Sequence, residues 1–590
     1  MFAYKTDREK LYSPCKITFA LLCSLFGGFV TGMCSLFFAS GPYGMDVWIS
    51  YLKNPYILVL NVLPPIIISA CLYLLLNRAV WSFVLTNVLV IVPSLINYFK
   101  IAFRGDCFIF SDITLVVEAG RMLEDYKLFI DKRIAIYLVV LALGCALTAI
   151  FARGRFEGGK GRFIAAAVIF AASFLLVPLY TSDGIYETKT KNDTVERTWT
   201  DSRLYMSKGF VYPFLHSVKD AIPTPPNGYD KNAAAEALGA FADEVIPDDK
   251  KVNIVCVMLE AYNDFSRFKE LTFTEDIYAK YRELEKMGYS GTLVTDVFAG
   301  DTRITEREFL TGLPFAFIDD FSKKSNSYVW YLRENGYTTE GSHPLNAWFY
   351  NRENINRNLG FENYYFTENY YKEHCGGDIT WDNAFFPEMY KIYAGRDRSK
   401  PYFSYSISYQ GHGPYDSVTA SFDAPYVESG HVSEADKNIM NNFLNAQKGT
   451  TEHLYSFVKD MLETEEPLVL VFFGDHKPWM GVGGSVYTSY GINIDTSTEE
   501  GFMNYYSTRY LIIANDAAKA VCGNDFLGEG ETLSAQFLMN KVFELCGYGG
   551  NSYMQFASSV MRENPIIHRS HTVPKLYEDV SYYYRRNFAY

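Results

Sequence analysis

Five long apolar stretches occupy the first 180 residues of the chain, and they constrain its fold more than any other feature. They cover approximately residues 17–39, 55–76, 80–99, 134–151 and 162–180. Each is long enough for a helix to cross the hydrocarbon core of a membrane, which takes about 20 residues. We therefore predict an N-terminal α-helical membrane domain with five transmembrane helices over residues 1–180.

Basic residues predict the orientation of these spans. They precede the first span, lie between the second and third, and lie between the fourth and fifth: Lys5, Arg8, Lys10, Lys16, Arg78, Arg153, Arg155, Lys160 and Arg162. By the positive-inside rule these segments are cytoplasmic, so five spans place everything after residue 180 outside. The spans hold almost no ionisable residues, which favours anchoring and lipid access over transport. The outer loop 100–133 carries charges of both signs, and its apolar residues predict short interfacial helices.

The remaining sequence divides into a linker and a globular domain. Residues 181–250 are polar and rich in turn-forming residues, and they include an amphipathic piece over 206–218 that we expect to lie on the membrane or on the globular domain. Residues 251–590 have the mixed composition of a folded domain. The net charge of -13, without a basic tract outside the membrane flanks, argues against nucleic-acid binding. Four cysteines after residue 250, without zinc-type spacing, do not make a disulfide scaffold.

The globular part reads as an α/β sheet. Residues 252–259 and 468–473 are nearly continuous β-rich apolar runs, as expected of parallel strands that are buried on both faces. Helical patterns lie between and after them, over residues 277–286, 306–310, 436–462 and 533–545. This alternation predicts a sheet with helices on both faces.

Both apolar runs end in residues that can bind a metal. Glu260 follows the first run, and Asp475 and His476 follow the second. Open α/β sheets bind ligands at the carboxyl ends of their strands. Either run alone is equally well explained by a helix cap or a surface loop, but together they favour a site for a hard divalent cation.

Three threonines in residues 298–312 are candidate nucleophiles, because metal coordination can activate a hydroxyl. Thr305 with Glu308 fits a capping box, so we expect Thr305 to start a helix. Thr311 then falls inside that helix. Thr302 lies one turn earlier, after Gly300 and Asp301, where helix-end amides can hold a phosphoryl oxygen. Thr302 is therefore the nucleophile that the sequence favours.

Four motifs occur in order behind the five spans: Leu259-Glu260, Gly300-Asp-Thr302-Arg-Ile-Thr-Glu306 with Glu308-Phe-Leu-Thr-Gly312, Gly411-His-Gly-Pro-Tyr415 and Gly474-Asp-His476. In this arrangement the whole chain resembles the lipoteichoic acid synthase family, the sulfatase-like phosphoglycerol transferases of the alkaline phosphatase superfamily. The resemblance implies a C-terminal α/β sulfatase-like domain over residues 251–590. It also implies one Mn²⁺ or Mg²⁺ ion, held by Glu260, Thr302, Asp475 and His476.

The same resemblance implies four residues that bind the phosphoglycerol group: His343, Tyr350, Arg352 and His412. Tyr350 stands where the family has tryptophan, and Asp301 and Arg307 replace the usual small and apolar neighbours of the threonine motif. These departures leave the head group open. There is no Cys/Ser-x-Pro-x-Arg run of the kind that a sulfatase matures into formylglycine.

The leading hypothesis is a two-step transfer at the outer face of a bacterial cell membrane. Thr302 takes phosphoglycerol from phosphatidylglycerol and passes it to a glycolipid or a growing lipoteichoic acid or other envelope polymer. The alternatives are a phosphoethanolamine transferase, a phosphodiesterase or sulfatase-like hydrolase of the same fold, and a non-catalytic protein that binds glycerolphosphate polymers. The sequence leaves the acceptor, the oligomeric state and the choice between a primase and a polymerase open.

Overall fold

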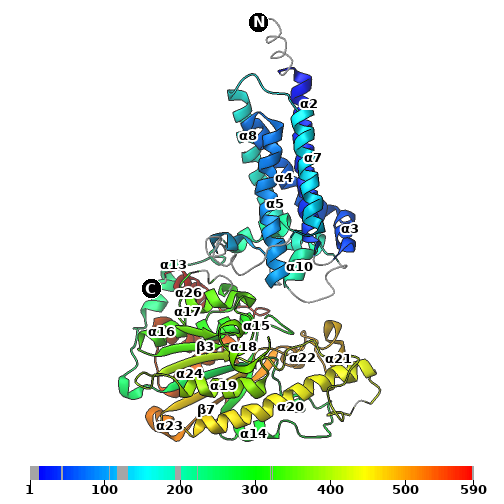
Figure 1. Cartoon of the computed structure of the whole chain (residues 1–590). Coiled ribbons are helices and arrows are strands. Elements are labelled where there is room, and N and C mark those ends of the chain that lie inside the picture. The colour runs from blue at the N-terminus through cyan, green and yellow to red at the C-terminus, as the bar shows by residue number, and fades with distance from the viewer. Residues whose placement is uncertain are drawn as a thin grey trace. The chain divides into compact units, whose positions relative to one another are not determined.

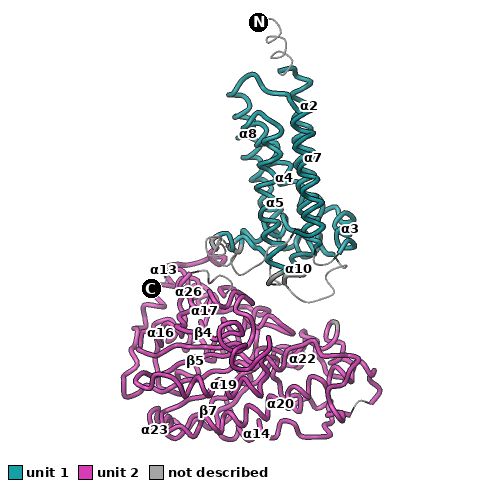
Figure 2. The backbone as a smooth tube through the Cα atoms, viewed as in Figure 1, with its two compact units in different colours: residues 1–223 teal, residues 224–590 magenta. Residues whose placement is uncertain are grey.

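The chain forms two compact units, residues 1–223 and residues 224–590 (Figure 2). The computed structural model describes residues 12–41, 44–104, 107–115, 130–192, 201–221, 224–318, 321, 323–428 and 430–587. The division falls inside the segment 181–250, for which the sequence predicts a linker.

Unit 1 is helical (Figure 1). Its helices are α2 (Pro14–Ala39), α3 (Met45–Lys53), α4 (Pro55–Leu76), α5 (Ala79–Arg104), α7 (Lys132–Phe151), α8 (Lys160–Ser173), α9 (Val177–Thr181), α10 (Asp201–Ser207), α11 (Val211–His216) and α12 (Val218–Ala221). Five helical segments among the described residues are long and apolar enough to cross a membrane: Pro14–Ala39, Pro55–Leu76, Ala79–Ala102, Lys132–Phe151 and Lys160–Thr181. The five predicted apolar helices are confirmed, whereas most of the predicted interfacial loop, residues 116–129, lies outside the described residues.

Small residues let the first helices of unit 1 pack closely. A Cβ atom on Gly28 would lie 2.6 Å from the carbonyl oxygen of Pro65, and one on Gly32 would lie 2.8 Å from Cα of Val62. Such close approach is how membrane helices gain packing where the surrounding solvent is already apolar. α2 therefore lies directly against α4.

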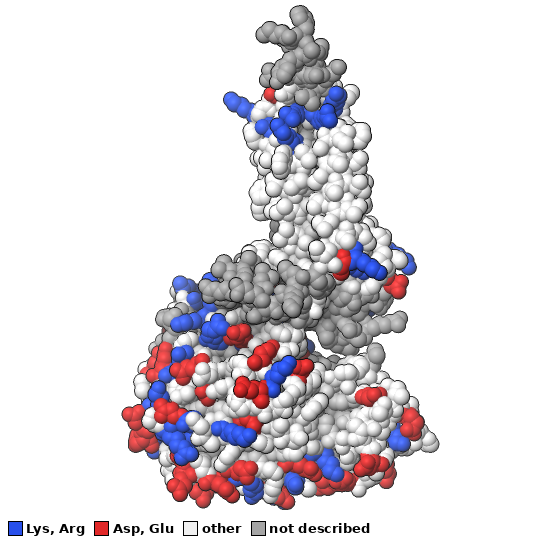
Figure 3. All heavy atoms as spheres, viewed as in Figure 1, with Lys and Arg blue, Asp and Glu red and all other residues white. Residues whose placement is uncertain are grey.

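Charges gather at the ends of this helical bundle. Figure 3 shows Lys and Arg side chains at one end and an almost uncharged band along the bundle. At the end where α4 stops and α8 begins, Arg162 donates to the carbonyls of Leu74 and Leu75 at 3.0 and 2.8 Å. Arg162 is one of the basic residues from which the cytoplasmic side is predicted.

The amphipathic segment of the predicted linker packs on unit 1. Met206, Phe210 and Val211 are buried in one apolar cluster with side chains of α2 and α4. Asn61 of α4 donates to the carbonyl of Lys208 at 2.8 Å. Residues 206–215 thus belong to the helical unit.

Unit 2 is built on one mixed sheet. Its strands are β1 (Asn253–Leu259), β2 (Tyr289–Val294), β3 (Thr338–Ser342), β4 (Asn363–Tyr365), β5 (Tyr402–Ile407), β6 (Leu468–Gly474), β7 (Ser507–Ala514), β8 (Gly528–Glu529) and β9 (Leu533–Ser534). The strand order is β4-β3-β5-β1-β6-β7-β2-β8, with β9 also paired to β2. β7 is antiparallel to both of its neighbours, β6 and β2, and the strands from β4 to β6 are parallel.

Both faces of this sheet are covered, which explains the unbroken apolar runs of its central strands. In β1, Ile254, Cys256 and Met258 face one core. The alternate residues Val255, Val257 and Leu259 face the other. Because successive side chains of a strand point to opposite faces, a strand between two helical layers must be apolar throughout.

The helices of unit 2 form the two covering layers (Figure 1). The layer over the face of Ile254 holds α13 (Lys231–Gly239), α15 (Thr302–Thr311), α16 (Tyr328–Glu334), α17 (Arg352–Leu359), α23 (Asp516–Cys522), α24 (Leu538–Cys546), α25 (Ser552–Glu563) and α26 (Lys575–Arg586). The layer over Val255 holds α14 (Ala279–Glu285), α19 (Asp382–Ala394), α20 (Glu434–Leu462) and α21 (Ser485–Ser489). Two further helices of unit 2 are α18 (Lys372–Cys375) and α22 (Glu499–Tyr506). The helix predicted over 533–545 begins only at Leu538, because residues 533–534 pair with β2.

Candidate metal centre and nucleophile

Five of the candidate site residues follow the ends of four adjacent parallel strands. In the order β3-β5-β1-β6, the strands end at residues 342, 407, 259 and 474. His343, the loop 408–415, Glu260 and Asp475 follow them directly. Parallel strands end at one edge of a sheet, so residues far apart in sequence meet there.

Glu260, Asp475 and His476 form a compact buried cluster, and their ligand atoms all lie within 4.8 Å of one another. Nε2 of His476 lies 3.1 Å from Oδ2 of Asp475 and 3.7 Å from Oε1 of Glu260. Burial, followed by the charge of Asp475, raises the pKa of Glu260 to about 8. Two carboxylates in this setting repel each other unless a cation lies between them.

Hydrogen bonds orient the cluster so that its lone pairs converge. Oδ1 of Asp475 accepts the backbone amides of Ala261 and His476, each at 2.8 Å, whereas the buried Oδ2 accepts no hydrogen bond. Nδ1 of His476 donates to the carbonyl of Lys477 at 2.8 Å, so the ring is fixed with Nε2 facing the two carboxylates. Two carboxylates and one imidazole thus fit a hard divalent cation.

Thr302 is the first residue of α15 and lies beside this cluster. Its Oγ1 is 3.4 Å from Oε2 of Glu260 and 3.5 Å from Nε2 of His476. The turn before it has three successive residues with positive φ, namely Ala299 at 64°, Gly300 at 153° and Asp301 at 61°. Such backbone is strained for residues other than glycine and is typical of functional turns. It presents the Thr302 hydroxyl at the amino end of a helix.

The capping role predicted for Thr305 is wrong. Because α15 begins at Thr302, Thr305 lies inside the helix, and its hydroxyl donates to the carbonyl of Asp475 at 2.8 Å. Thr305 therefore ties the helix that carries Thr302 to the strand end that carries Asp475. Thr311 lies inside the helix, as predicted, and donates to the carbonyl of Arg307 at 2.6 Å.

Arg352 is buried and faces the same helix. Its Nε donates to Oε2 of Glu306 at 2.9 Å, while its Nη1 has no hydrogen-bond partner. Tyr350 lies in the segment just before it, with a φ of 56°, and its ring centre is 5.2 Å from the Arg352 guanidinium carbon. A buried guanidinium with an unused donor is suited to an anionic ligand.

The two candidate histidines differ in environment. His343 is buried, and its Nδ1 lies 3.2 Å from the carbonyl of Ile407. Burial, followed by the charge of Arg352, lowers the pKa of His343 well below its ordinary value, so this ring is neutral. His412 is exposed, and its ring stacks on Tyr409 with centres 4.8 Å apart.

Asn263 holds the cluster in place and was not predicted from the sequence. The side-chain amide of Asn263 donates to the carbonyl of His476 at 2.8 Å, and its oxygen accepts from Nζ of Lys477 at 2.9 Å. Burial lowers the pKa of Lys477 to about 7. No sequence motif marks Asn263. Glu306, the partner of Arg352, could have been predicted as a site residue, because it lies four residues after Thr302 on the same helical face.

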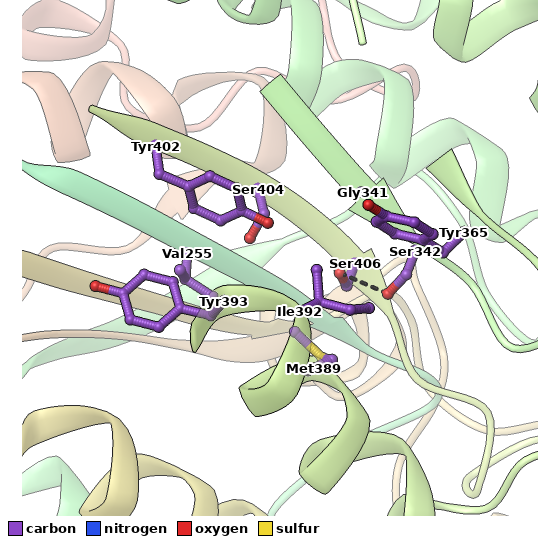
Figure 4. Close-up of a pocket in the computed structure, with 10 residues that line it drawn as sticks. All are labelled: Val255, Gly341, Ser342, Tyr365, Met389, Ile392, Tyr393, Tyr402, Ser404 and Ser406. Atoms are coloured by element: carbon purple, nitrogen blue, oxygen red, sulfur yellow. Dashed lines mark hydrogen bonds between the residues drawn. The ribbon is translucent and has the colours of Figure 1, made fainter. Parts of the chain in front are cut away.

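A small cavity lies between β5 and α19 (Figure 4). Its volume of about 10 Å³ accommodates roughly one water molecule. Figure 4 shows Ser342 and Ser406 in its wall, joined by a hydrogen bond of 2.9 Å. None of its lining residues is a candidate site residue, so it is no substrate pocket.

Sequence comparison identifies this region. The sulfatase family profile matches residues 252–520, from β1 into α23. Residues 252–520 form a sulfatase domain. All eight candidate site residues lie inside this sulfatase domain, and Thr302 is the first residue of its helix α15. The predicted fold class, apolar helices followed by a sulfatase-like α/β domain, is therefore confirmed.

Curated proteins match this chain at low identity. A Rhizobium meliloti protein named for cyclic beta-1,2-glucan modification is 24% identical over 406 residues, which are 66% of this chain and 60% of that protein. A Staphylococcus aureus lipoteichoic acid synthase is 21% identical over 477 residues, which are 74% of this chain and 69% of that protein.

Solved structures with a similar arrangement include the Streptococcus pyogenes phosphoglycerol transferase GacH in complex with sn-glycerol-1-phosphate. It has a TM-score of 0.49 and 18% identity, over 61% of this chain and 94% of that chain. The Listeria monocytogenes lipoteichoic acid synthase LtaP has a TM-score of 0.42 and 18% identity, over 54% of this chain and 79% of that chain. The sulfatase match concerns residues 252–520 alone.

Proposed function

We propose that this chain is a metal-dependent phosphoglycerol transferase that carries its phospho-group on Thr302. The observation that supports this most is the position of Thr302, at the start of a buried helix and within 3.5 Å of Glu260 and His476. A formylglycine sulfatase needs cysteine or serine at the nucleophile, and this chain has threonine there. Threonine cannot be matured into formylglycine, whereas its hydroxyl can form a covalent intermediate directly.

In the first step the Thr302 oxygen attacks the phosphorus of phosphatidylglycerol. A bond from Oγ1 to phosphorus forms, the bond from phosphorus to the diacylglycerol oxygen breaks, and that oxygen takes a proton. Oε2 of Glu260, at 3.4 Å, is an acceptor for the hydroxyl hydrogen of Thr302. His412 is the exposed group that we assign to protonate the departing alkoxide.

Glu260, Thr302, Asp475 and His476 are the residues that would hold Mn²⁺ or Mg²⁺. When bound there, such an ion lowers the pKa of the hydroxyl and offsets charge on the phosphoryl oxygens. Asn263 and Thr305 hold this site in position, because they donate hydrogen bonds to the backbone carbonyls of His476 and Asp475. Oδ2 of Asp475 is buried and accepts no hydrogen bond, which supports this assignment.

Arg352, His343 and Tyr350 are proposed to bind the glycerophosphate group. The unused Nη1 of Arg352 is a donor for a phosphoryl oxygen, and Glu306 fixes the plane of the guanidinium. The neutral His343 donates from Nδ1 to the carbonyl of Ile407, so its Nε2 is an acceptor for a hydroxyl of the glycerol group. Tyr350 packs on the guanidinium and limits the space beside it.

In the second step an acceptor hydroxyl attacks the phosphorus on Thr302 and releases the threonine oxygen. Relatives of this chain are named for lipoteichoic acid synthesis and for cyclic beta-1,2-glucan modification. We propose a glycolipid or an envelope glycan as the acceptor. We also propose that residues 1–180 anchor the enzyme in a bacterial cell membrane, with residues 251–590 on its outer side, so that the lipid substrate reaches the site from the membrane.

Diacylglycerol release tests this function. The full chain is placed in lipid nanodiscs that contain phosphatidylglycerol, with Mn²⁺, and diacylglycerol is quantified. We expect release by the parent protein and a loss of at least about a thousandfold in Thr302→Ala, since the covalent route is then closed. Equal release by Thr302→Ala would refute the proposal. If diacylglycerol were released from phosphatidylethanolamine and not from phosphatidylglycerol, the transferred group would be phosphoethanolamine and the proposed mechanism would stand.

A further inference from the structure

An aromatic ladder leads from the surface of unit 2 to the candidate metal centre. Trp381 lies just before α19, and its ring centre is 5.9 Å from that of Tyr409. Tyr409 in turn stacks on His412 at 4.8 Å, with an interplanar angle of 16°. Trp381 is 49% exposed. Among the described residues of unit 2 it is the one exposed tryptophan.

The loop that carries Tyr409 and His412 packs against Glu260. The hydroxyl of Ser408 accepts the backbone amide of Glu260 at 3.1 Å. A Cβ atom on Gly411 would lie 1.9 Å from the carbonyl oxygen of Glu260, so only glycine allows the loop to come this close. Burial, followed by the charge of Glu260, raises the pKa of Tyr409. The ladder therefore ends beside a proposed metal ligand.

The ladder is held firmly, unlike an isolated exposed aromatic residue. The backbone amide of Asp382 donates to the side chain of Gln410 at 3.1 Å, which joins the residue after Trp381 to the residue after Tyr409. The carboxylate of Asp382 is fully buried and accepts the hydroxyl of Thr450 at 2.6 Å. A single exposed aromatic residue needs no explanation, but a stacked and anchored row of rings next to a catalytic centre does.

The two loops that carry the ladder contain no basic side chain that could bind an anion. The segments 376–384 and 408–416 contain three aspartates, Asp378, Asp382 and Asp416, and no lysine or arginine. In the proposed function, the phosphate of the donor lipid is bound by Arg352, which lies on α17. A neutral group with an apolar face and several hydroxyls suits the ladder, and a sugar ring has these properties, because its C–H face packs on aromatic rings.

We propose that Trp381, Tyr409 and His412 form a binding platform for a sugar ring of a neutral glycan acceptor. Its role as acceptor site rests on the proposed function, whereas the binding of sugar does not. In the transfer, a hydroxyl of the bound sugar forms a bond to the phosphorus on Thr302 while the bond from phosphorus to Oγ1 breaks. The hydroxyl proton passes to His412, and the released threonine oxygen takes back the proton that Glu260 accepted in the first step.

Direct binding measurements test the platform. The full chain is placed in phosphatidylcholine nanodiscs, which contain neither the donor lipid nor a sugar detergent, and is titrated with a β-1,2-linked glucose oligosaccharide by calorimetry. We expect Trp381→Ala to weaken binding at least about tenfold, as for truncation of an aromatic anchor. Trp381→Phe keeps a ring and is expected to stay within about threefold of the parent. Tyr390→Ala removes an exposed aromatic residue within α19, away from the ladder, and serves as the matched control.

Failure of the platform is distinguishable from failure of the proposed function. Absence of oligosaccharide binding by the parent, or equal binding by Trp381→Ala and the parent, overturns the platform even when diacylglycerol is released. Binding that depends on Trp381 supports the platform even when no diacylglycerol is released. If Trp381→Ala loses affinity for phosphatidylglycerol vesicles and keeps its affinity for the oligosaccharide, the ladder belongs to the donor lipid and the proposal is wrong.

Discussion

Arg352 and Glu306 form an ion pair of 2.9 Å whose two side chains are only 2% and 4% exposed. Glu306 lies one helical turn after Thr302 on α15, and Arg352 begins α17. The pair therefore joins the helix of the proposed nucleophile to the residue proposed to grip the phosphate. Each side chain also retains one unused polar atom, Nη1 of Arg352 and Oε1 of Glu306.

Loss of Glu306 is expected to destabilise unit 2 strongly. Glu306→Ala leaves the buried guanidinium unpaired, which costs about 3–5 kcal/mol. Glu353→Ala is the matched control, because Glu353 pairs with Arg357 at 3.5 Å on the exposed face of α17, where such a pair contributes about 0.5 kcal/mol. Thermal unfolding of the full chain in detergent compares the two variants. Similar melting temperatures for both would contradict the structural role of the buried pair.

Variants at Thr302 and Thr305 are expected to affect different properties: a change at Thr302 abolishes activity, and a change at Thr305 lowers stability. Thr305→Val removes the hydroxyl that the carbonyl of Asp475 accepts, which costs about 1–3 kcal/mol and leaves partial activity. Thr302→Val is expected to keep the melting temperature within a few degrees and to abolish diacylglycerol release. Thr305→Ser retains the hydroxyl and serves as the control. The assignment fails if the Thr305 variant is inactive and the Thr302 variant is active.

A divalent cation is expected to stabilise the folded chain. It relieves the repulsion between Glu260 and Asp475, and a ligand at 100 times its dissociation constant adds about 2.7 kcal/mol. Mn²⁺ should raise the melting temperature of the parent and of Asp397→Asn, which alters an exposed carboxylate. It should have little effect on Asp475→Asn. An identical rise in Asp475→Asn would place the ion elsewhere.

Acid is expected to weaken the fold through His568. Burial lowers the pKa of His568 to about 4, with Asp296 opposing and Arg569 and His571 adding to the shift. The unfolded chain binds this proton below its ordinary pKa of 6.5, so stability falls as the pH drops from 6.5 towards 4, by about 1.4 kcal/mol per pH unit. His568→Gln should reduce this slope of melting temperature against pH, whereas His374→Gln, at an exposed position, should not. Equal slopes would remove His568 as the cause.

The sequence was most informative where a single physical property dominates. Apolar length predicted the five span-length helices, and unbroken apolar runs predicted β1 and β6 with Glu260 and Asp475 at their ends. The sheet then brings these ends together because β1 and β6 are neighbours. That pairing was inferred from the general behaviour of α/β sheets, since nothing in either segment encodes its partner.

The sequence was least informative where a residue acts through a distant segment. Thr305 matches a capping box, yet the turn before Thr302 starts the helix one turn earlier, and its hydroxyl reaches Asp475 instead. The pairing of Glu306 with Arg352, 46 residues away, depends on how α15 and α17 pack. The stack of Trp381 on Tyr409 likewise depends on the contact of Asp382 with Gln410. Such contacts follow from tertiary structure alone.

Mass spectrometry of the reacting enzyme tests the central claim most directly. The full chain is mixed with phosphatidylglycerol and Mn²⁺ without an acceptor, quenched in acid and digested. The account predicts a glycerophosphoryl group on Thr302, absent from Thr302→Ala and not moved to Thr305. A glycerophosphoryl group on another residue, or continued diacylglycerol release by Thr302→Ala without any adduct, would contradict the account.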